Sequence, residues 1–192
     1  MGDLSNRYDR VAAEYLANRH KSDVGMGIVR AWAGSLPSGA AVLDLGCGDG
    51  VPVSRALVAA GLSVYGVEAS PTLAAAFRVN FPRARVVCEP AERSALFGRT
   101  FAGAVAWGLL FLLPAEAQRT VVRNVAAALE PGGRFLFTAP AQVCTWDDLL
   151  TGLPSVSLGA ATYHAVCREA GLVPVAEYAD EGDNHYYDVA RP

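Results

Sequence analysis

The sequence is poor in the features that mark metal sites, membrane spans and nucleic-acid surfaces. Its four cysteines form no C-x-x-C pair and its three histidines have no ligand spacing, so we expect free thiols and no metal. The longest apolar stretch, residues 101–113, ends at Pro114 and is shorter than the roughly 20 residues that cross a bilayer. With a net charge of −3 and no cluster of lysine or arginine, we expect no nucleic-acid partner and no membrane partner.

What is present indicates a globular enzyme-sized unit. A chain of 192 residues with 52% hydrophobic and 18% charged residues can bury a substantial core. We therefore expect residues 1–192 to form a single domain, with N-terminal helices in 1–36 and an α/β core in 37–192. Charged residues near the N-terminus interrupt any export signal, which predicts a cytoplasmic location. Nothing in the sequence indicates an oligomeric state.

Short apolar runs alternate with helical patterns from residue 40 onward. The runs 40–45, 63–68, 84–88, 101–107 and 134–139 read as strands, and most are separated by helical segments, which is typical of a parallel, doubly wound sheet. Before the sheet, an apolar stripe from Tyr8 to Leu16 predicts an amphipathic helix, and a second helix is expected at about 23–34. The tail reads as two strands joined by the turn-rich segment 179–184, so we expect one antiparallel strand at the end.

The segment "DLGCGDG" at 44–50 places three alternate glycines directly after the first strand. Glycine allows a sharp turn and a close approach of the backbone to a nucleotide-like ligand at the carboxyl edge of the sheet. Glu68 ends the second strand, 22 residues after Gly46, where an acid can accept hydrogen bonds from ribose hydroxyls. The dinucleotide pattern G-x-G-x-x-G fails, because its third glycine would fall at Val51.

A strand followed by D-x-G-x-G-x-G closely resembles the first motif of the class I S-adenosylmethionine-dependent methyltransferases. The segment "CEPAE" at 88–92 resembles the family's third-strand segment, and "FAGAVAWGLLFLLP" resembles its fourth motif with Ala102 in place of the usual aspartate. The resemblance covers nearly the whole chain. It implies an α/β, doubly wound, Rossmann-like sheet of seven strands, mostly parallel with a C-terminal antiparallel strand, preceded by N-terminal capping helices.

The same resemblance implies S-adenosyl-L-methionine as the cofactor and S-adenosyl-L-homocysteine as the product. The residues expected at its methionine end are those of the glycine loop: Asp44, Gly46, Cys47, Gly48 and Gly50. Glu68 would hold the ribose, and Ala69 and Leu73 would flank the adenine. Glu89 would meet the adenine amino group. Pro90 lacks an amide hydrogen, so Ala91 would supply the backbone bond to the ring.

Three further residues are candidates for the cofactor site. In related enzymes a leading helix closes over the cofactor, which implies a contact from Tyr15 and a carboxylate partner in Arg19; packing of Tyr15 in the core is the competing interpretation. Trp107 ends the fourth strand at the ligand-binding edge, where an aromatic face would attract a sulfonium. Core packing competes there too.

Acceptor residues are expected at the same edge of the sheet. His185 begins the last strand after an acidic turn and is a candidate general base, followed by Tyr186, although a lone histidine at a strand start is more often structural. The irregular segment 141–155 is expected to cover the acceptor pocket. In it Trp146 and Asp147, with Asp148, would hold an aromatic or cationic acceptor.

The resemblance implies transfer of a methyl group from S-adenosylmethionine to a small-molecule acceptor by in-line displacement. Nucleic-acid methylation is disfavoured by the charge balance and because "WGLLFLLP" replaces a D-P-P-Y-type motif. Three alternatives remain: a non-catalytic subunit that binds or senses the cofactor, a methyltransferase acting on a protein side chain, and an NAD-dependent dehydrogenase. Val51 counts against the last.

Overall fold

A seven-stranded sheet forms the centre of the computed structural model, which describes residues 3–19 and 23–192, without the side chain of Arg19. The strand order is β3-β2-β1-β4-β5-β9-β8. Their bounds are β1 (Ala41–Leu45), β2 (Ser63–Glu68), β3 (Arg85–Cys88), β4 (Phe101–Ala106), β5 (Leu129–Thr138), β8 (Val173–Ala179) and β9 (His185–Ala190). Strands β1 to β5 pair in parallel, and β9 pairs antiparallel with both β5 and β8. The expected doubly wound sheet with one reversed strand is confirmed.

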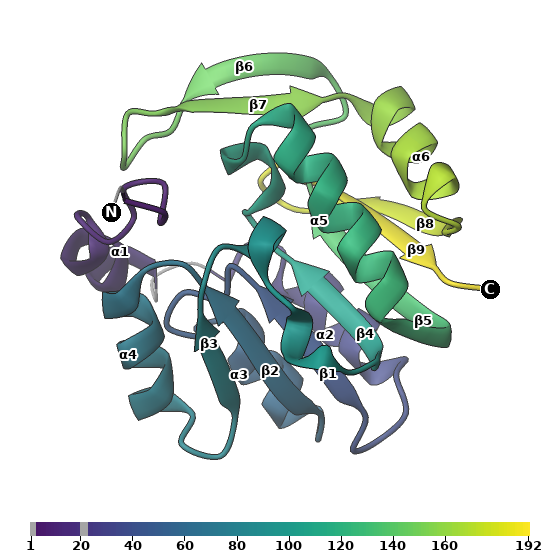
Figure 1. Cartoon of the computed structure of the whole chain (residues 1–192), viewed down its shortest axis with the longest axis horizontal. Coiled ribbons are helices and arrows are strands. Elements are labelled where there is room, and N and C mark those ends of the chain that lie inside the picture. Colours follow the sequence, from purple (N-terminus) through teal and green to yellow (C-terminus); the bar gives the residue numbers. More distant parts are fainter. Residues whose placement is uncertain (1–2, 20–22) are drawn as a thin grey trace.

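Helices cover both faces of this sheet (Figure 1). Helices α2 (Met26–Gly34) and α3 (Val53–Ala59) lie on one face, and α5 (Ala115–Ala128) and α6 (Ala160–Glu169) lie on the other. Helix α4 (Pro71–Asn80) places Phe77 in the same apolar cluster as α2 and α3. Its start follows from sequence, since Ser70 caps the Leu73 N–H and Pro71 occupies the first turn. Among the described residues, no helix is long and apolar enough to cross a membrane.

Two regions differ from the sequence-based expectations. The stripe from Tyr8 to Leu16 is helical only from Ala12, where α1 (Ala12–Arg19) begins; residues 8–11 form turns that follow the left-handed Asn6 and Arg7 (φ 53° and 65°). The segment expected to be irregular forms a separate two-stranded antiparallel sheet, β6 (Val143–Asp147) and β7 (Pro154–Leu158). This pair lies across the top of Figure 1, beyond the carboxyl ends of the parallel strands.

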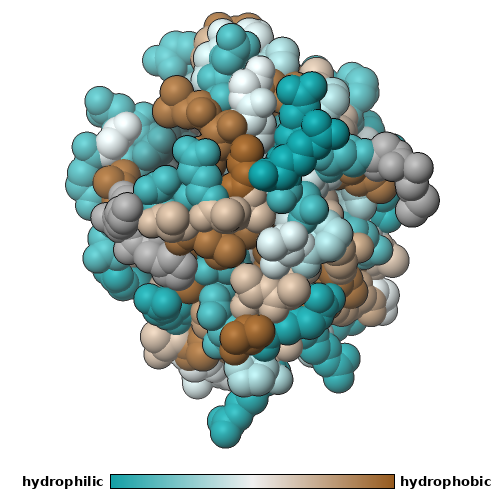
Figure 2. Space-filling model, turned by 90° about the vertical axis from the view of Figure 1, so that its left-hand side faces the viewer, coloured by the Kyte–Doolittle hydropathy of each residue, from teal (hydrophilic) through white to brown (hydrophobic). Residues whose placement is uncertain are grey.

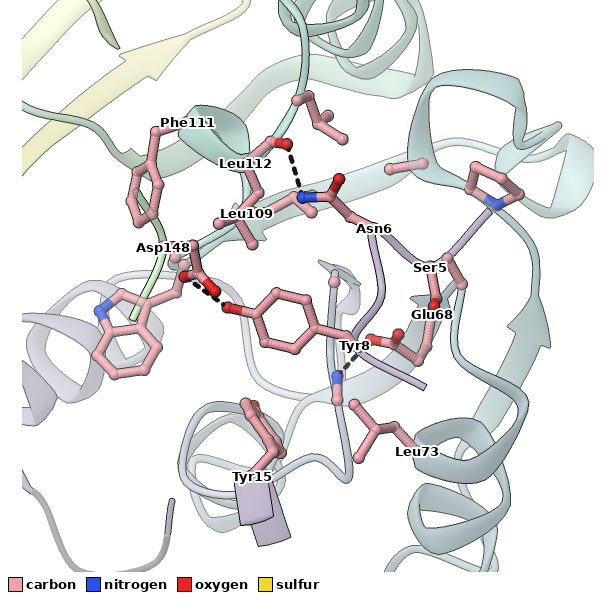
Figure 3. A pocket seen from close by; sticks show the side chains of 18 of the residues that line it. Ser5, Asn6, Tyr8, Tyr15, Glu68, Leu73, Leu109, Phe111, Leu112 and Asp148 are labelled. Atoms are coloured by element: carbon pink, nitrogen blue, oxygen red, sulfur yellow. Dashed lines mark hydrogen bonds between the residues drawn. The ribbon is translucent and has the colours of Figure 1, made fainter. Parts of the chain in front are cut away.

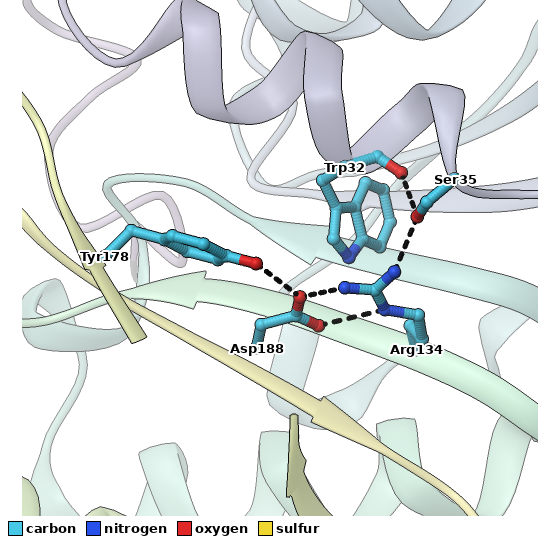
Figure 4. A network of polar contacts seen from close by, with 5 residues as sticks. All are labelled: Trp32, Ser35, Arg134, Tyr178 and Asp188. Atoms are coloured by element: carbon cyan, nitrogen blue, oxygen red, sulfur yellow. Dashed lines mark hydrogen bonds and ion pairs between the residues drawn. The ribbon is translucent and has the colours of Figure 1, made fainter. Parts of the chain in front are cut away.

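A buried polar network joins the last strands to α2 (Figure 4). Asp188 on β9 is fully buried, and its carboxylate accepts from Arg134 on β5, whose Nε lies 3.2 Å from Oδ1. The same guanidinium donates to the Ser35 hydroxyl at the end of α2, 2.6 Å away. The network compensates the cost of burying the Asp188 charge and holds α2 against the sheet.

Candidate functional site

The glycine loop between β1 and α3 has three residues in the left-handed region: Gly46 (φ 64°), Gly48 (φ 56°) and Gly50 (φ 85°). A side chain at each would also meet a neighbour. A Cβ at Gly48 would lie 2.7 Å from the Tyr15 hydroxyl, and one at Gly46 would lie 2.9 Å from Leu109 Cδ1. Both the backbone angles and the lack of space therefore require glycine in this loop.

Glu68 connects this loop to the end of β2. Its carboxylate accepts hydrogen bonds from the backbone N–H of Gly48 to Oε2 and of Ser70 to Oε1, both at 2.8 Å. Burial raises the pKa of Glu68 above its usual 4.5, and the hydrogen bonds from Ser70 and Gly48 partly oppose that shift. A carboxylate has about four acceptor positions, so Glu68 keeps acceptor capacity for a donor from a ligand.

A cavity of about 560 Å³ opens beside Glu68 (Figure 3). This volume lies in the range of small-molecule binding sites. Of the residues proposed from the sequence, eleven line it: Tyr15, Gly46, Gly48, Glu68, Ala69, Leu73, Glu89, Pro90, Ala91, Trp107 and Asp148. The structure therefore brings together, at the carboxyl edge of the sheet, the glycine loop, the acid of β2, the segment after β3 and the end of β4.

The indole of Trp107 is positioned by a hydrogen-bonded chain behind the cavity wall. Its Nε1 donates to the Tyr186 hydroxyl at 2.7 Å, and that hydroxyl donates to Oδ2 of Asp180 at 2.9 Å. Tyr186 is fully buried, and burial raises the pKa of its phenol well above the ordinary value. Tyr186 does not line the cavity. It is therefore placed to support Trp107 and not to contact a ligand.

Other expected cofactor residues lie behind the loop. Asp44 is buried and accepts from the Ser54 hydroxyl of α3 at 2.6 Å, which ties β1 to α3. Cys47 is buried, and burial raises the pKa of its thiol well above the usual range. Gly50 packs against the rings of Phe77 and Phe81. None of the three lines the main cavity, and the side chain of Arg19 lies outside the described residues.

Of the expected acceptor residues, Asp148 lines the cavity, and the others are placed differently from the prediction. His185 points to the α6 face, where its Nε2 lies 2.6 Å from Oε2 of Glu177, and it does not line the cavity. The reason is strand alternation, which puts His185 and Tyr187 on one face of β9 and Tyr186 on the other. Asp147 is exposed, and Trp146 packs on the cavity residue Phe111 with ring centroids 5.3 Å apart. Neither Trp146 nor Asp147 lines the cavity.

Sequence reasoning missed the segment that covers the cavity. Residues 4–8 cross it (Figure 3), with the Asn6 amide donating to the Leu112 carbonyl at 3.0 Å and the Tyr8 hydroxyl donating to Asp148 at 3.1 Å. Asp9 fixes the far end by accepting from the Ser70 hydroxyl at 2.6 Å, at the start of α4. From the sequence, Tyr8 was read only as the start of an apolar stripe, which does not indicate which partners these side chains contact.

A second group of missed residues forms an apolar wall of the cavity. It comes from the short helix η3 (Leu110–Leu112), its flanks and the loop after β6: Leu109, Phe111, Leu112, Leu113 and Leu150. The run "LLFLL" reads as buried strand or loop from sequence. The side chains of this run reach the cavity because the chain turns into η3 there.

Comparison with known proteins agrees with this geometry. Residues 42–133 match a family model described as a methyltransferase domain. That range contains the glycine loop, Glu68, the segment after β3 and the end of β4. The comparison with curated proteins found no match.

Many solved structures share the fold. Magnesium protoporphyrin IX methyltransferase from Synechocystis PCC 6803, crystallised with S-adenosylmethionine, matches with a TM-score of 0.77 and 15% identity over 100% of this chain and 98% of its own. A Burkholderia thailandensis 1,6-didemethyltoxoflavin-N1-methyltransferase, with its substrate and S-adenosylhomocysteine bound, matches with a TM-score of 0.69 and 19% identity over 97% and 90%. The [4+2]-cyclase SpnF matches with a TM-score of 0.77 and 16% identity over 98% and 96%. The resemblance to class I methyltransferases is therefore confirmed: the chain has their fold, and residues 42–133 match the methyltransferase-domain family.

Proposed function

We propose that the protein transfers a methyl group from S-adenosylmethionine to a small-molecule acceptor by in-line displacement. The observation that carries this proposal is the junction of the glycine loop with Glu68 at the edge of a 560 Å³ cavity, within a chain whose residues 42–133 match a methyltransferase domain. We propose that residues 1–192 act as one domain, since the N-terminal segment closes the cavity that the core opens.

The residues present fit the cofactor. The backbone at Gly46 and Gly48, with Tyr15, would hold its methionine end, and the carboxylate of Glu68 would accept the ribose hydroxyls. Leu73 and Ala69 would lie against the adenine. Glu89 already accepts the Ser94 hydroxyl at Oε1, 2.6 Å away, which leaves Oε2 for the adenine amino group.

Bound in this way, the cofactor supplies a methyl group on a positively charged sulfur, which needs no further activation. The protein then has to align the acceptor with the methyl group and to exclude water. The apolar wall from Leu109 to Leu113 and the segment carrying Asn6 and Tyr8 perform both tasks. Trp107, held by Tyr186, presents an aromatic ring suited to a nearby sulfonium.

The segment that covers the cavity favours a small-molecule acceptor over a protein side chain. A protein side chain would have to enter beneath residues 4–8, which are tied down at Leu112, Asp148 and Ser70. Two proteins of the same fold act on small molecules by their names, a magnesium porphyrin and a toxoflavin precursor. The cyclase among the similar structures shows that this fold is not confined to methyl transfer, so the reaction itself must be tested.

Two measurements test the proposal. Calorimetry should show binding of S-adenosylmethionine and S-adenosylhomocysteine but not of NAD. Incubation with methyl-labelled cofactor and a small-metabolite extract should then place label in the small-molecule fraction rather than on protein. Glu68→Gln should weaken cofactor binding, while Glu116→Gln, an exposed glutamate on α5, should not. Binding of NAD alone, or transfer of label only to protein, would contradict the proposal.

A further inference from the structure

Asp148 is a carboxylate held in a fixed position at the wall of the cavity. Its Oδ1 accepts three hydrogen bonds, from the backbone N–H of Leu150 at 3.2 Å and from the backbone N–H and hydroxyl of Thr151 at 2.8 Å each. These bonds belong to the turn between β6 and β7. They commit one oxygen to the local structure and leave Oδ2 directed away from it.

Oδ2 of Asp148 faces the cavity and accepts the Tyr8 hydroxyl at 3.1 Å. In the view of Figure 3 the Tyr8 ring lies between Asp148 and Glu68, so the two carboxylates flank the segment that covers the cavity. A carboxylate oxygen has more than one acceptor position, so Oδ2 can accept a second donor from a bound molecule while it keeps Tyr8.

The neighbours of Asp148 in the cavity are apolar. Phe111 and Leu112 line the wall, Leu150 follows Asp148 by two residues, and Phe111 is supported from behind by Trp146. Leu149, at the tip of the same loop, is 99% exposed. The face of the molecule seen in Figure 2 carries a band of apolar side chains among polar ones. A hydrogen bond to a charged group is strong in such surroundings, and an anion near it is repelled.

We propose that the methyl acceptor is an apolar molecule bearing an amine or hydroxyl group, and that Oδ2 of Asp148 selects and orients it by accepting its N–H or O–H. This inference rests on the proposed function, because it assigns the substrate class of the same cavity. Asp148 is a specificity-determining residue in this account. The sequence had named Asp148 together with its neighbour Asp147, which is exposed and outside the cavity.

Three probes with one ring system test the proposal: tryptamine, tryptophol and indole-3-acetate, which carry an ammonium, a hydroxyl and a carboxylate. Their binding is measured by calorimetry on the full chain saturated with S-adenosylhomocysteine. Tryptamine should bind most tightly, tryptophol less tightly, and indole-3-acetate weaker than tryptamine by about tenfold or more, since charge-assisted hydrogen bonds have that strength.

Variants separate the role of Asp148 from the rest of the site. Asp148→Asn keeps an oxygen for the Leu150 and Thr151 donors, so the turn should persist while tryptamine affinity falls about tenfold and S-adenosylhomocysteine affinity stays unchanged. Asp147→Asn should leave the order of the three probes as in the wild type. Tyr8→Phe should also preserve that order, because Oδ2 remains.

The outcomes are distinct. Equal binding of the three probes, binding of none of them to the loaded protein, or a loss of preference in Asp147→Asn but not in Asp148→Asn would overturn the role of Asp148. Failure of the wild type to bind S-adenosylhomocysteine would overturn the proposed function itself.

Discussion

The backbone N–H of Gly48 donates a 2.8 Å hydrogen bond to Oε2 of Glu68, and this bond joins the glycine loop to the end of the second strand. The second oxygen of Glu68 accepts the N–H of Ser70 and so orients the start of α4. One buried carboxylate thus arranges the two turns that frame the cavity. Its protonation state should control both the loop and the ligand.

Cofactor affinity should rise with pH through the pKa of Glu68. Burial raises that pKa above 4.5, so the protonated form persists in the folded protein at a pH where an exposed glutamate is ionised. An ionised carboxylate accepts hydrogen bonds from ribose hydroxyls more strongly than the protonated acid does, so S-adenosylmethionine affinity should increase from about pH 4.5 towards neutrality. Calorimetry across that range should show the increase in the wild type and its absence in Glu68→Gln. An identical pH profile in both proteins would rule Glu68 out as the ribose ligand.

The stability of the fold should respond in the opposite direction. Because Glu68 holds its proton more tightly in the folded state than in the unfolded chain, its contribution to stability is largest below pH 4.5 and is lost as the pH rises through the raised pKa. In urea denaturation the wild type should therefore lose stability relative to Glu68→Gln over this window. A gain instead would mean that the backbone hydrogen bonds outweigh the cost of burial.

Gly48→Ala should reduce cofactor affinity by at least about tenfold, because the added Cβ would strain a left-handed residue and displace Tyr15. Two matched variants separate these causes. Gly132→Ala has the same strain (φ 79°) with open space around it, and should cost only stability. Gly27→Ala, in α2 with open space, should cost neither. Unchanged affinity in Gly48→Ala would mean that the cofactor does not contact this loop.

His185→Ala should leave S-adenosylhomocysteine and tryptamine affinities unchanged and lower Tm by about 2 °C or less, as for a partly exposed ion pair.

Burial alone would raise the pKa of Glu177, but hydrogen bonds from His185 and His164 outweigh it and hold the pKa below 4.5. Because this pKa is lowered, the carboxylate of Glu177 stabilises the fold above pH 4.5. Its contribution is lost as the pH falls through the lowered pKa. The variant should lose less stability in acid than the wild type. A fall in turnover with a known acceptor would restore His185 as a base.

Asp188→Asn should destabilise the protein by about 2 kcal/mol, because it removes the fully buried charge partner of the half-buried Arg134. Tyr178→Phe removes only a long hydrogen bond of 3.4 Å to the same carboxylate and should cost less than about 1 kcal/mol. Chemical denaturation measures both, and cofactor affinity should not change in either. Equal effects of the two substitutions would show that the ion pair contributes little.

The glycine loop and Glu68 were predictable because their constraints are local. Three glycines after an apolar strand and an acid at the end of the next strand act through backbone geometry that nearby residues determine. Strand positions followed from apolar runs for the same reason. The resemblance to methyltransferases then extended this reading to Leu73 and Ala91, which the structure places at the cavity.

The acceptor side was not predictable in the same way, because it depends on contacts between distant segments. Tyr8 meets Asp148 across 140 positions in sequence, and no local pattern encodes that pairing. His185 and Asp147 were expected at the site but lie outside the cavity, whereas Asp148, named beside Asp147, lines it. Successive side chains of a strand point to opposite faces, so a correct assignment of β9 did not establish which face His185 occupies.

The most direct test of the account is a crystal structure of the protein with S-adenosylhomocysteine. We expect the ligand in the 560 Å³ cavity, with its ribose hydroxyls within hydrogen-bonding distance of Glu68 and its sulfur on the side that faces Trp107 and Asp148. A ligand bound elsewhere, or a cavity that stays empty at saturating concentration, would contradict it.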